Sequence, residues 1–205
     1  MLPFLKSKGV SCIDRWFVSH LDKDHISGLE EIVESRYDVG SVMLAKGILR
    51  DEEYEKMINL LEKWKIPVQY MDVGDRLRGR NACFTCLGPH EQTLTTDPNA
   101  GSMLLLYEDC GFSGFFSGDI SADEEKKLLS EQKLSGVSFY KSAHHGSKYS
   151  NSYDFLRLLN PAVSVVSCAE KNDYGHPGRE AVRNMEEKSG SVYYTMHSGQ
   201  IRICC

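Results

Sequence analysis

The sequence of 205 residues lacks several features that would place it in a specialised class of protein. No segment approaches the roughly 18 consecutive apolar residues of a membrane-spanning helix. The first residues also carry no apolar core of a secretory signal. Internal repeats, low-complexity tracts and linkers are absent as well. We therefore expect one soluble globular domain over residues 1–205, which is long enough to bury a core.

A basic excess is also absent, because the formal net charge is -5 at pH 7. Proteins that grip nucleic acid along their whole surface carry a clear excess of Lys and Arg, so this class is excluded, whereas a local basic groove is not. The seven cysteines are odd in number and scattered, which indicates reduced thiols rather than a disulfide framework. We expect a cytoplasmic rather than an exported protein, or a soluble domain of a larger membrane protein.

Cys83 and Cys86 form a lone CxxC pair. A structural zinc site would need a second pair, and a redox motif would need a helix pattern after the first cysteine. Since neither follows, we interpret both residues as ordinary strand cysteines.

The apolar pattern alternates between strand and helix signals, which is typical of the α/β class. Apolar runs predict strands over residues 13–18, 39–45, 82–87, 103–107, 112–116, 137–142, 163–168, 192–195 and 200–204, and an extended segment from residue 67. Helical spacing predicts helices near residues 26–33, 51–64, 122–129, 153–159 and 179–187. The runs 103–107 and 112–116 flank a short turn, so they predict a hairpin.

Four predicted strands end in loops that contain His or Asp. The strands ending near residues 18, 116, 142 and 168 precede, in order, His20, Asp119, the pair His144 and His145, and His176. Strand-end loops converge on one rim in layered α/β proteins, so we expect these side chains to meet. With His25, these loops hold five of the seven histidines; His90 and His197 lie elsewhere.

The first of these loops places four metal-ligating residue types within six positions: His20, Asp22, Asp24 and His25. In an extended loop the alternating His20, Asp22 and Asp24 can project to one side, while His25 opens the next helix. Imidazole with carboxylate suits zinc, manganese or iron. The alternative is a solvated helix cap with Asp24 as the N-cap, which explains one aspartate but neither histidine.

Each later loop has a plain structural alternative of its own. Asp119 is also suited to cap the helix that begins near residue 122. His144 and His145 are expected to point in opposite directions at a strand end, one as a ligand and the other toward substrate, or to be a surface pair. His176, between Gly175 and Pro177, is equally consistent with a turn.

The run of residues 19–29 resembles the HxHxDH signature of metallo-β-lactamase-fold hydrolases, in the HxDxDH form of the ComEC competence type, which is attached to DNA-uptake channels. Four later segments are similar to that subfamily's motifs in the same order: residues 86–89, 117–120, 141–147 and 174–177. The resemblance covers almost the whole chain and implies an αββα sandwich. Family members begin with two strands and an Asp-x-Gly turn ahead of the segment matching residues 2–9, so the resemblance implies an N-terminally truncated sandwich.

The resemblance also implies a centre of two divalent ions, zinc first and manganese second, that activates a water molecule. The metal ligands that it implies are His20 and Asp22 for one ion, Asp24, His25 and His176 for the other, Asp119 as the bridge, and His144 or His145 to complete a shell. The implied catalytic residues are Asp24, Asp119 and His145. The implied substrate contacts are Lys141, His145, Ser147 and Lys148. The histidine that many relatives place after the middle strand has no clear match; His90 is displaced and reads as a surface residue.

For substrate, the resemblance points to a phosphodiester such as DNA. Basic residues lie in or beside the motif loops, where they can meet phosphates or be plain surface: Lys141, Lys148, Lys171, Arg179 and Arg183. Because the fold alone never fixes a substrate, hydrolysis of a lactone, lactam or thioester is an alternative. Another alternative is a catalytically silent, metal-stabilised interaction module that forms a homodimer through an uncovered sheet edge.

Overall fold

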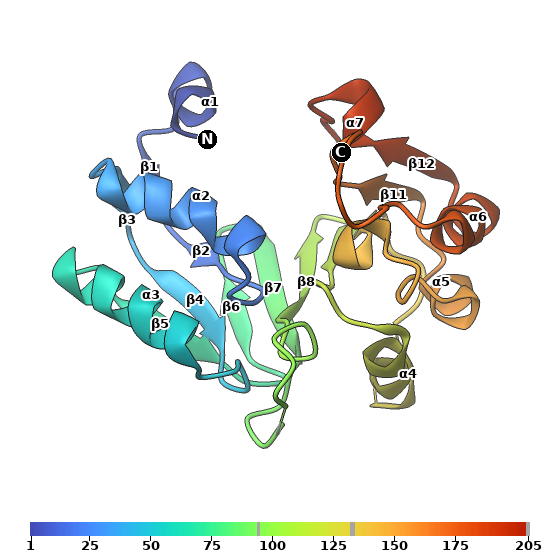
Figure 1. Cartoon of the computed structure of the whole chain (residues 1–205), viewed down its shortest axis with the longest axis horizontal. Helices are drawn as coiled ribbons and strands as arrows, with labels where there is room; N and C mark the ends of the chain where they lie inside the picture. Colours follow the sequence, from blue (N-terminus) through green and yellow to red (C-terminus); the bar gives the residue numbers. More distant parts are fainter. Residues whose placement is uncertain (94, 132–133, 204–205) are drawn as a thin grey trace.

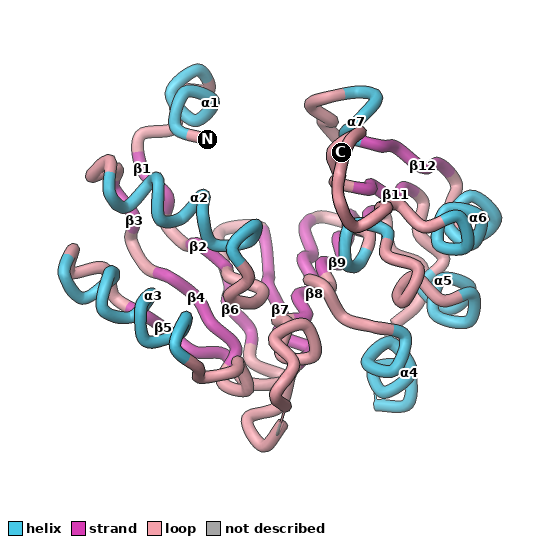
Figure 2. Tube along the Cα trace, viewed as in Figure 1, coloured by secondary structure: helices cyan, strands magenta, loops and turns pink. Residues whose placement is uncertain are grey.

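The computed structural model describes residues 1–93, 95–131 and 134–203, which form four layers (Figure 1). Two sheets face each other and helices cover the outer side of each, as the colouring by secondary structure in Figure 2 shows. The helices are α1 (Leu2–Ser7), α2 (Lys23–Glu34), α3 (Glu52–Lys63), α4 (Ala122–Glu131), α5 (Tyr153–Leu159), α6 (Arg179–Lys188) and α7 (Thr195–Ser198), with a 3-10 turn, η1, at Ala143–Gly146. None of these helices is long and apolar enough to cross a bilayer.

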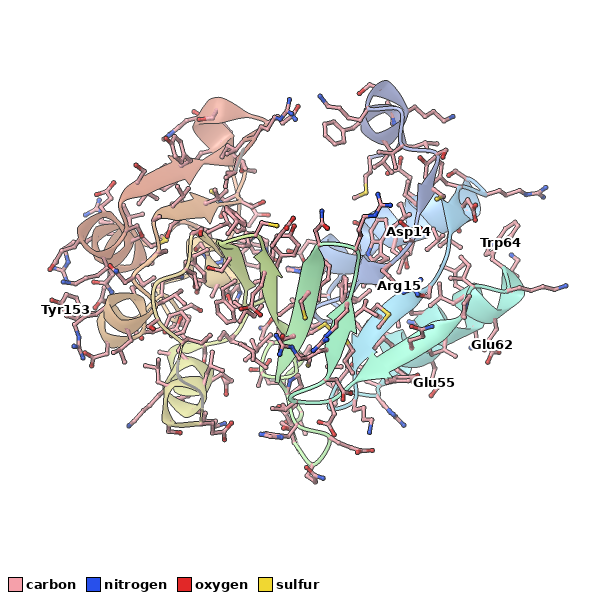
Figure 3. The ribbon with its side chains drawn as sticks, turned by 180° about the vertical axis from the view of Figure 1, so that it is seen from behind. Asp14, Arg15, Glu55, Glu62, Trp64 and Tyr153 are labelled. Carbon is pink, nitrogen blue, oxygen red and sulfur yellow. The ribbon has the colours of Figure 1, made fainter. Side chains whose placement is uncertain are left out.

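The first sheet is parallel and has the strand order β2 (Trp16–Phe17), β4 (Val42–Ala45) and β5 (Val68–Met71). A separate short parallel pair is formed by β1 (Cys12–Ile13) and β3 (Asp38–Val39), and β3 lies between β2 and β4 in the chain. Helices α2 and α3 bury their apolar stripes on this sheet, and one cluster joins Leu29, Leu44 and Leu61. The polar stripe of α3 faces outward, where Figure 3 labels Glu55 and Glu62.

The second sheet is mixed and has seven strands in the order β12-β11-β10-β9-β8-β7-β6. Their bounds are β6 (Arg76–Arg78), β7 (Ala82–Gly88), β8 (Leu104–Asp109), β9 (Phe112–Phe116), β10 (Phe139–Lys141), β11 (Val163–Val166) and β12 (Ser191–Tyr194). Strands β6 to β9 are antiparallel, whereas β9 to β12 are parallel. Helices α4, α5 and α6 cover the outer face, and their core includes Phe115, Tyr140 and Phe155.

The inner faces of the two sheets meet in a third cluster. It joins Met43 and Met71 of the first sheet to Cys86, Met103 and Leu105 of the second. Aliphatic and thioether side chains fill this layer, which excludes water between the sheets. The predicted αββα sandwich is therefore confirmed.

Most predicted elements are present, including the hairpin of β8 and β9 and the strand cysteines of β7. The predicted strand over residues 200–204 is wrong within its described part, because residues 200–203 pair with no strand there; Cys204 lies outside the described residues. The chain instead turns through α7, and Ile201 and Ile203 lie over Phe112, Phe139 and Val165 of the sheet. Apolar alternation here reflects packing onto a sheet face rather than pairing at its edge.

Candidate metal centre

Four loops bring the predicted ligands together at one rim of the sandwich. Strands β9, β10 and β11 are adjacent and parallel, so their carboxyl ends open at the same edge. Those ends lead to Asp119, to His144 and His145, and to the loop of His176. In the other sheet, the loop after β2 holds His20, and the first turn of α2 holds His25.

His25, His145 and Asp119 form the centre of the cluster. The Nε2 atoms of His25 and His145 lie 3.2 Å apart. Asp119 places Oδ1 3.3 Å from His25 Nε2 and Oδ2 3.4 Å from His145 Nε2. Asp24 Oδ2 lies 3.2 Å from His145 Nε2 and 3.8 Å from His25 Nε2. Two ligand groups emerge among the described residues: His20, His25 and Asp119; and Asp24, His25 and His145.

The hydrogen bond of the other ring nitrogen sets the tautomer of His145. Its Nδ1 lies 2.7 Å from the carbonyl oxygen of Ser167, an acceptor, so Nδ1 carries the proton. The Nε2 lone pair is then free to ligate, as second-shell partners arrange for metal-bound imidazoles. Two imidazole nitrogens bound to one tetrahedral zinc would lie about 3.3 Å apart, given the usual Zn–N length. The observed separation from His25 fits that requirement.

A buried polar atom without a partner supports the same assignment. His20 Nε2 is buried and makes no hydrogen bond among the described residues, and the buried Asp119 Oδ1 has the ring nitrogen of His25 3.3 Å away. Buried donors and acceptors are normally paired, and the binding of a cation is one reason for an exception. His20 Nε2 lies 3.7 Å from Asp22 Oδ2 and 4.0 Å from Asp119 Oδ2. These residues therefore fit a divalent cation.

The surroundings of the two most buried ligands, Asp119 and His20, favour their deprotonated forms. Burial alone would raise the pKa of Asp119, but hydrogen bonds from the rings of His145 and His25 outweigh it and hold that pKa well below its ordinary value. Burial, with the nearby His25, lowers the pKa of His20 to about 4. Before any metal binds, the cluster thus holds a carboxylate and a neutral imidazole ready to ligate.

Comparison with known proteins adds the family context. No protein-family model matches the chain. ComE operon protein 3 of Bacillus subtilis is 27% identical over 202 residues, 98% of this chain. Competence protein ComA of Neisseria gonorrhoeae is 27% identical over 194 residues, 93% of this chain. The chain spans about a quarter of the length of each relative, 26% and 25% respectively.

Solved structures share the arrangement of layers. The metallo-β-lactamase fold protein YhfI of Bacillus subtilis has a TM-score of 0.58 at 10% identity, over 94% of this chain and 80% of that chain. This chain has the metallo-β-lactamase fold. The diiron β-hydroxylase CmlA of Streptomyces venezuelae has a TM-score of 0.56 at 14% identity. The match covers 89% of this chain and 44% of the CmlA chain. The resemblance to the ComEC competence type of this fold is confirmed by the two sequence relatives.

Asp22 and Asp24 hold different places in the first loop of this metallo-β-lactamase fold. Asp22, not Asp24, is the N-cap residue of α2, although its side chain makes no capping hydrogen bond. The capping alternative for Asp24 is therefore wrong. Burial and the neighbouring Asp24 raise the pKa of Asp22, which lies near His20 at the buried side of the site. Asp24 is exposed and belongs with His145.

His144 and His145 do not point in opposite directions, as the strand pattern predicts. Both residues adopt left-handed backbone conformations, with φ of 47° and 53°. Strand alternation does not apply to such residues, and both rings turn toward Asp119. His144 Nε2 lies 3.9 Å from Asp119 Oδ2, and His145 Nε2 is closer.

His176 lies at the outer side of the cluster. Its ring centroid is 5.3 Å from that of His144 and 6.4 Å from that of His145. It belongs to neither of the two ligand groups, so its role as a ligand stays a prediction. His90 is half-exposed, with Nε2 3.5 Å from Glu131, and is likewise in neither group.

Ser102 supports the site although it belongs to none of the sequence motifs. Ser102 Oγ accepts the backbone N–H of Asp119 and lies 3.2 Å from Nδ1 of His20. It precedes β8, which runs antiparallel to β9, so the amino end of one strand lies beside the carboxyl end of the other. A pattern based on the carboxyl ends of strands does not include Ser102, whose only sequence signal is a serine directly before an apolar run.

A buried network fixes the loop that carries the adjacent histidines. Glu125 accepts the backbone N–H groups of Asn151 and Ser152 at 2.5 and 2.9 Å. The Asn151 side chain donates to the carbonyl of Ala143 and accepts from the Tyr140 hydroxyl, each at 3.0 Å. These bonds tie the histidine turn to α4 and β10.

The predicted substrate contacts lie in two different surroundings. Lys148 borders a cleft of about 650 Å³ together with Asp119, His144 and Tyr149. Lys141 lines an apolar hollow of about 550 Å³ on the other side, where His25 forms part of the wall. Ser147 is buried, and its Oγ accepts the backbone N–H of Tyr149, which places it in the loop's own structure.

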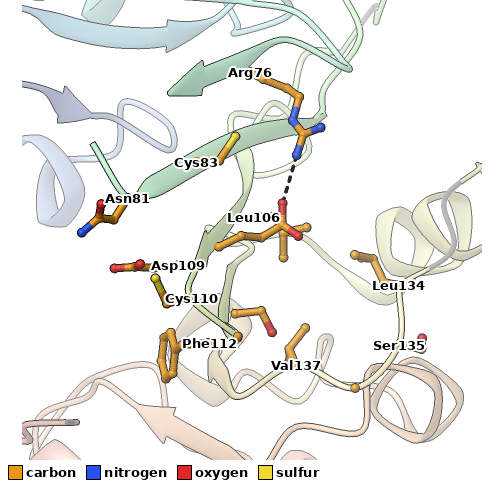
Figure 4. Close-up of a pocket in the computed structure, with 14 residues that line it drawn as sticks. Arg76, Asn81, Cys83, Leu106, Asp109, Cys110, Phe112, Leu134, Ser135 and Val137 are labelled. Carbon is orange, nitrogen blue, oxygen red and sulfur yellow. Dashed lines mark hydrogen bonds and ion pairs between the residues drawn. The ribbon is translucent and has the colours of Figure 1, made fainter. Parts of the chain in front are cut away.

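A further hollow of about 640 Å³ lies away from this chemistry (Figure 4). Arg76 crosses one side of it and pairs with Glu108 at 3.3 Å. It contains none of the metal-site residues. We assign it no part in the site.

Proposed function

We propose that this domain is a metal-dependent hydrolase that uses metal-activated water to cleave a phosphodiester. The observation that carries the proposal is the convergence of His25 Nε2 and His145 Nε2 on the two oxygens of Asp119. Bound divalent ions would supply a hydroxide at neutral pH and stabilise the developing oxyanion. The chain then needs no nucleophile of its own.

The protein residues prepare and orient this chemistry. His25 belongs to both ligand groups, but its one imidazole lone pair would bind a single ion, so the two oxygens of Asp119 would serve the two ion positions. His20, neutral above a pH of about 4, would complete the buried position, and Asp24 with His145 the outer one. Asp22 and His144 lie close enough to contribute further ligands.

Lys148 is the residue of the cleft beside Asp119 that suits an anionic substrate, since the same lining also carries the carboxylates of Asp97, Asp123 and Glu180. An ammonium at the mouth of the cleft can meet a phosphate oxygen, while the ion centre neutralises the scissile group. One of the two sequence relatives is named a competence protein, which supports a nucleic acid as the source of the phosphodiester.

Hydrolysis of a chromogenic phosphodiester tests the proposal. Protein reconstituted with zinc or manganese is assayed in parallel with lactone, lactam and thioester substrates. We expect phosphodiester turnover that Asp119→Asn lowers by at least about 100-fold, because its bridging charge is lost. The matched control is Asp123→Asn, an exposed carboxylate lining the same cleft, which should keep most of the activity. A metal-loaded protein without phosphodiester turnover would refute the proposal.

The apolar hollow favours a second candidate, hydrolysis of a lactone or thioester with an apolar chain. Phe84, Leu105 and Phe116 line it beside His25. Lys141 donates to the carbonyl of Ser142, and burial lowers its pKa, which reduces its strength as a phosphate anchor. Turnover in the same panel that rises with acyl-chain length, without phosphodiester cleavage, would select this candidate.

A further inference from the structure

Two unusually exposed tyrosines flank the metal centre. The side chain of Tyr174 is 83% exposed and that of Tyr149 is 65% exposed, the two highest values among the exposed large apolar residues. An aromatic ring so open to water gains nothing from burial in the free protein. Isolated exposed apolar residues are common, so the positions of these two must decide what they do.

Tyr174 stacks on the edge of the cluster. Its ring lies nearly parallel to that of His176, at 17° and 5.7 Å between centroids. The His176 ring lies in turn 21° from the plane of the His145 ring. The rings of His145, His176 and Tyr174 thus follow one another from the metal centre outward, and the Tyr174 ring at the outer end is largely open to solvent.

The loop of Tyr174 is held in place rather than loose. Asn172 donates from Nδ2 to the carbonyls of His176 and Ala169, at 2.7 and 3.0 Å. Its Oδ1 accepts the N–H of His176 at 2.9 Å. A loop closed at both ends by one side chain presents its tip without a large ordering cost on binding.

Tyr149 comes from the neighbouring loop and completes the surface. The two loops touch, since the N–H of Gly178 donates to the carbonyl of Gly146 at 2.8 Å. Tyr149 borders the cleft of Asp119 and His144, and Lys148 Nζ lies 4.9 Å from its ring centroid. One ring therefore lies beside the cleft with a cation over it, and the other rises from the adjacent loop.

We propose that Tyr174, assisted by Tyr149, is a stacking platform for the unpaired bases of a single-stranded nucleic acid. Flat, exposed rings with nearby cations are how proteins hold single strands, because every base has a π face. A duplex keeps its bases inside its own stack and cannot use these rings. The proposal rests on the proposed phosphodiester function and narrows its substrate to strands with exposed bases.

Binding by fluorescence anisotropy tests the platform independently of turnover. The probe is a labelled phosphorothioate strand of roughly eight thymidines, compared with an abasic strand of the same length and with a duplex. We expect Tyr174→Ala to weaken binding of the base-bearing strand roughly 5- to 100-fold and the abasic strand little. Tyr174→Phe, which keeps the ring, should bind as the wild type does.

Tyr153→Ala is the matched control. Tyr153 is 42% exposed and has a lysine over its ring, as Tyr149 does, but it lies on the outer side of α5 (Figure 3). It should leave both affinities unchanged. Equal weakening of the base-bearing and abasic strands by Tyr174→Ala, or equal affinity for the duplex, would overturn the platform. If base-dependent binding holds while the wild type cleaves no phosphodiester, the proposed function fails and the platform stands.

Discussion

His25 and His145 approach each other to 3.2 Å between their Nε2 atoms, although 120 positions separate them in the chain. One residue follows a strand of the first sheet and the other a strand of the second. Two imidazole lone pairs at that distance repel each other unless a proton or a metal ion lies between them. The pair therefore couples the two halves of the sandwich to whatever cation they share.

We expect divalent metal to stabilise the folded chain. Binding that requires the folded state adds about 2.7 kcal/mol when the free ion is at 100 times its Kd. Thermal unfolding with zinc and with a chelator should show a higher Tm with the metal. The variant His25→Ala should lose the increase, because His25 belongs to both ligand groups. His90→Ala, which alters a half-exposed histidine outside both groups, should keep it.

In the metal-free protein, the pKa values of two histidines should be shifted in opposite directions from the ordinary value. Burial lowers the pKa of His20 to about 4, whereas the hydrogen bond with Asp119 raises the pKa of His145 above 6.5. Nuclear magnetic resonance of the imidazole carbons would follow both rings. A His20 ring that titrates near its ordinary value would contradict its buried, neutral state.

These pKa shifts carry opposite signs for stability. Between about pH 4 and 6.5 the unfolded chain protonates His20 while the folded chain does not, so this residue contributes about 3 kcal/mol that is lost on acidification. The His145 contribution is complete below pH 6.5 and is lost as the pH rises through its raised folded pKa. Urea unfolding of the wild type and of His20→Gln at pH 4.5 and 6.5 measures the contribution of His20 to the free energy of unfolding. An equal difference between the two proteins at both pH values would rule it out.

Glu125→Ala should destabilise the chain and loosen the histidine turn. The carboxylate is buried and accepts two backbone N–H groups, which the alanine variant would leave without partners. Their loss should cost about 2–4 kcal/mol in the free energy of urea unfolding. Metal affinity should fall as well, since the same network positions the turn of His144 and His145. Glu131→Ala, exposed on the same helix, should change the stability by less than about 0.5 kcal/mol.

Gly146→Ala should disturb the contact between the two outer loops. Gly146 has a φ of +80°, and an added Cβ would lie 2.7 Å from Cβ of Pro177. Gly136 has a φ of +64° with open space around it, so Gly136→Ala measures the backbone strain alone, about 1 kcal/mol. We expect the Gly146 variant to lose more stability than this control and also to bind metal more weakly. Equal losses would show that the loop contact is unimportant.

The pattern along the chain is enough to predict most of the elements and the ligand types. Alternating and helical apolar spacing encode β10, β11 and α5 locally, and the crowded loop from His20 to His25 marks a metal site without any partner in view. Local periodicity indicates which face of each helix or strand is buried, so it also predicts that helices and sheets pack in layers.

The pairing of ligands depends on contacts between distant segments. The left-handed turn at His144 and His145 breaks strand alternation and points both rings at Asp119, and His145 rather than His176 joins Asp24. Ser102 enters the site only because β8 runs antiparallel to β9. Residues 200–203 alternate like a strand yet lie across a sheet face. Periodicity specifies the chemistry available on each segment, whereas the approach of side chains across two sheets follows from packing that no single segment encodes.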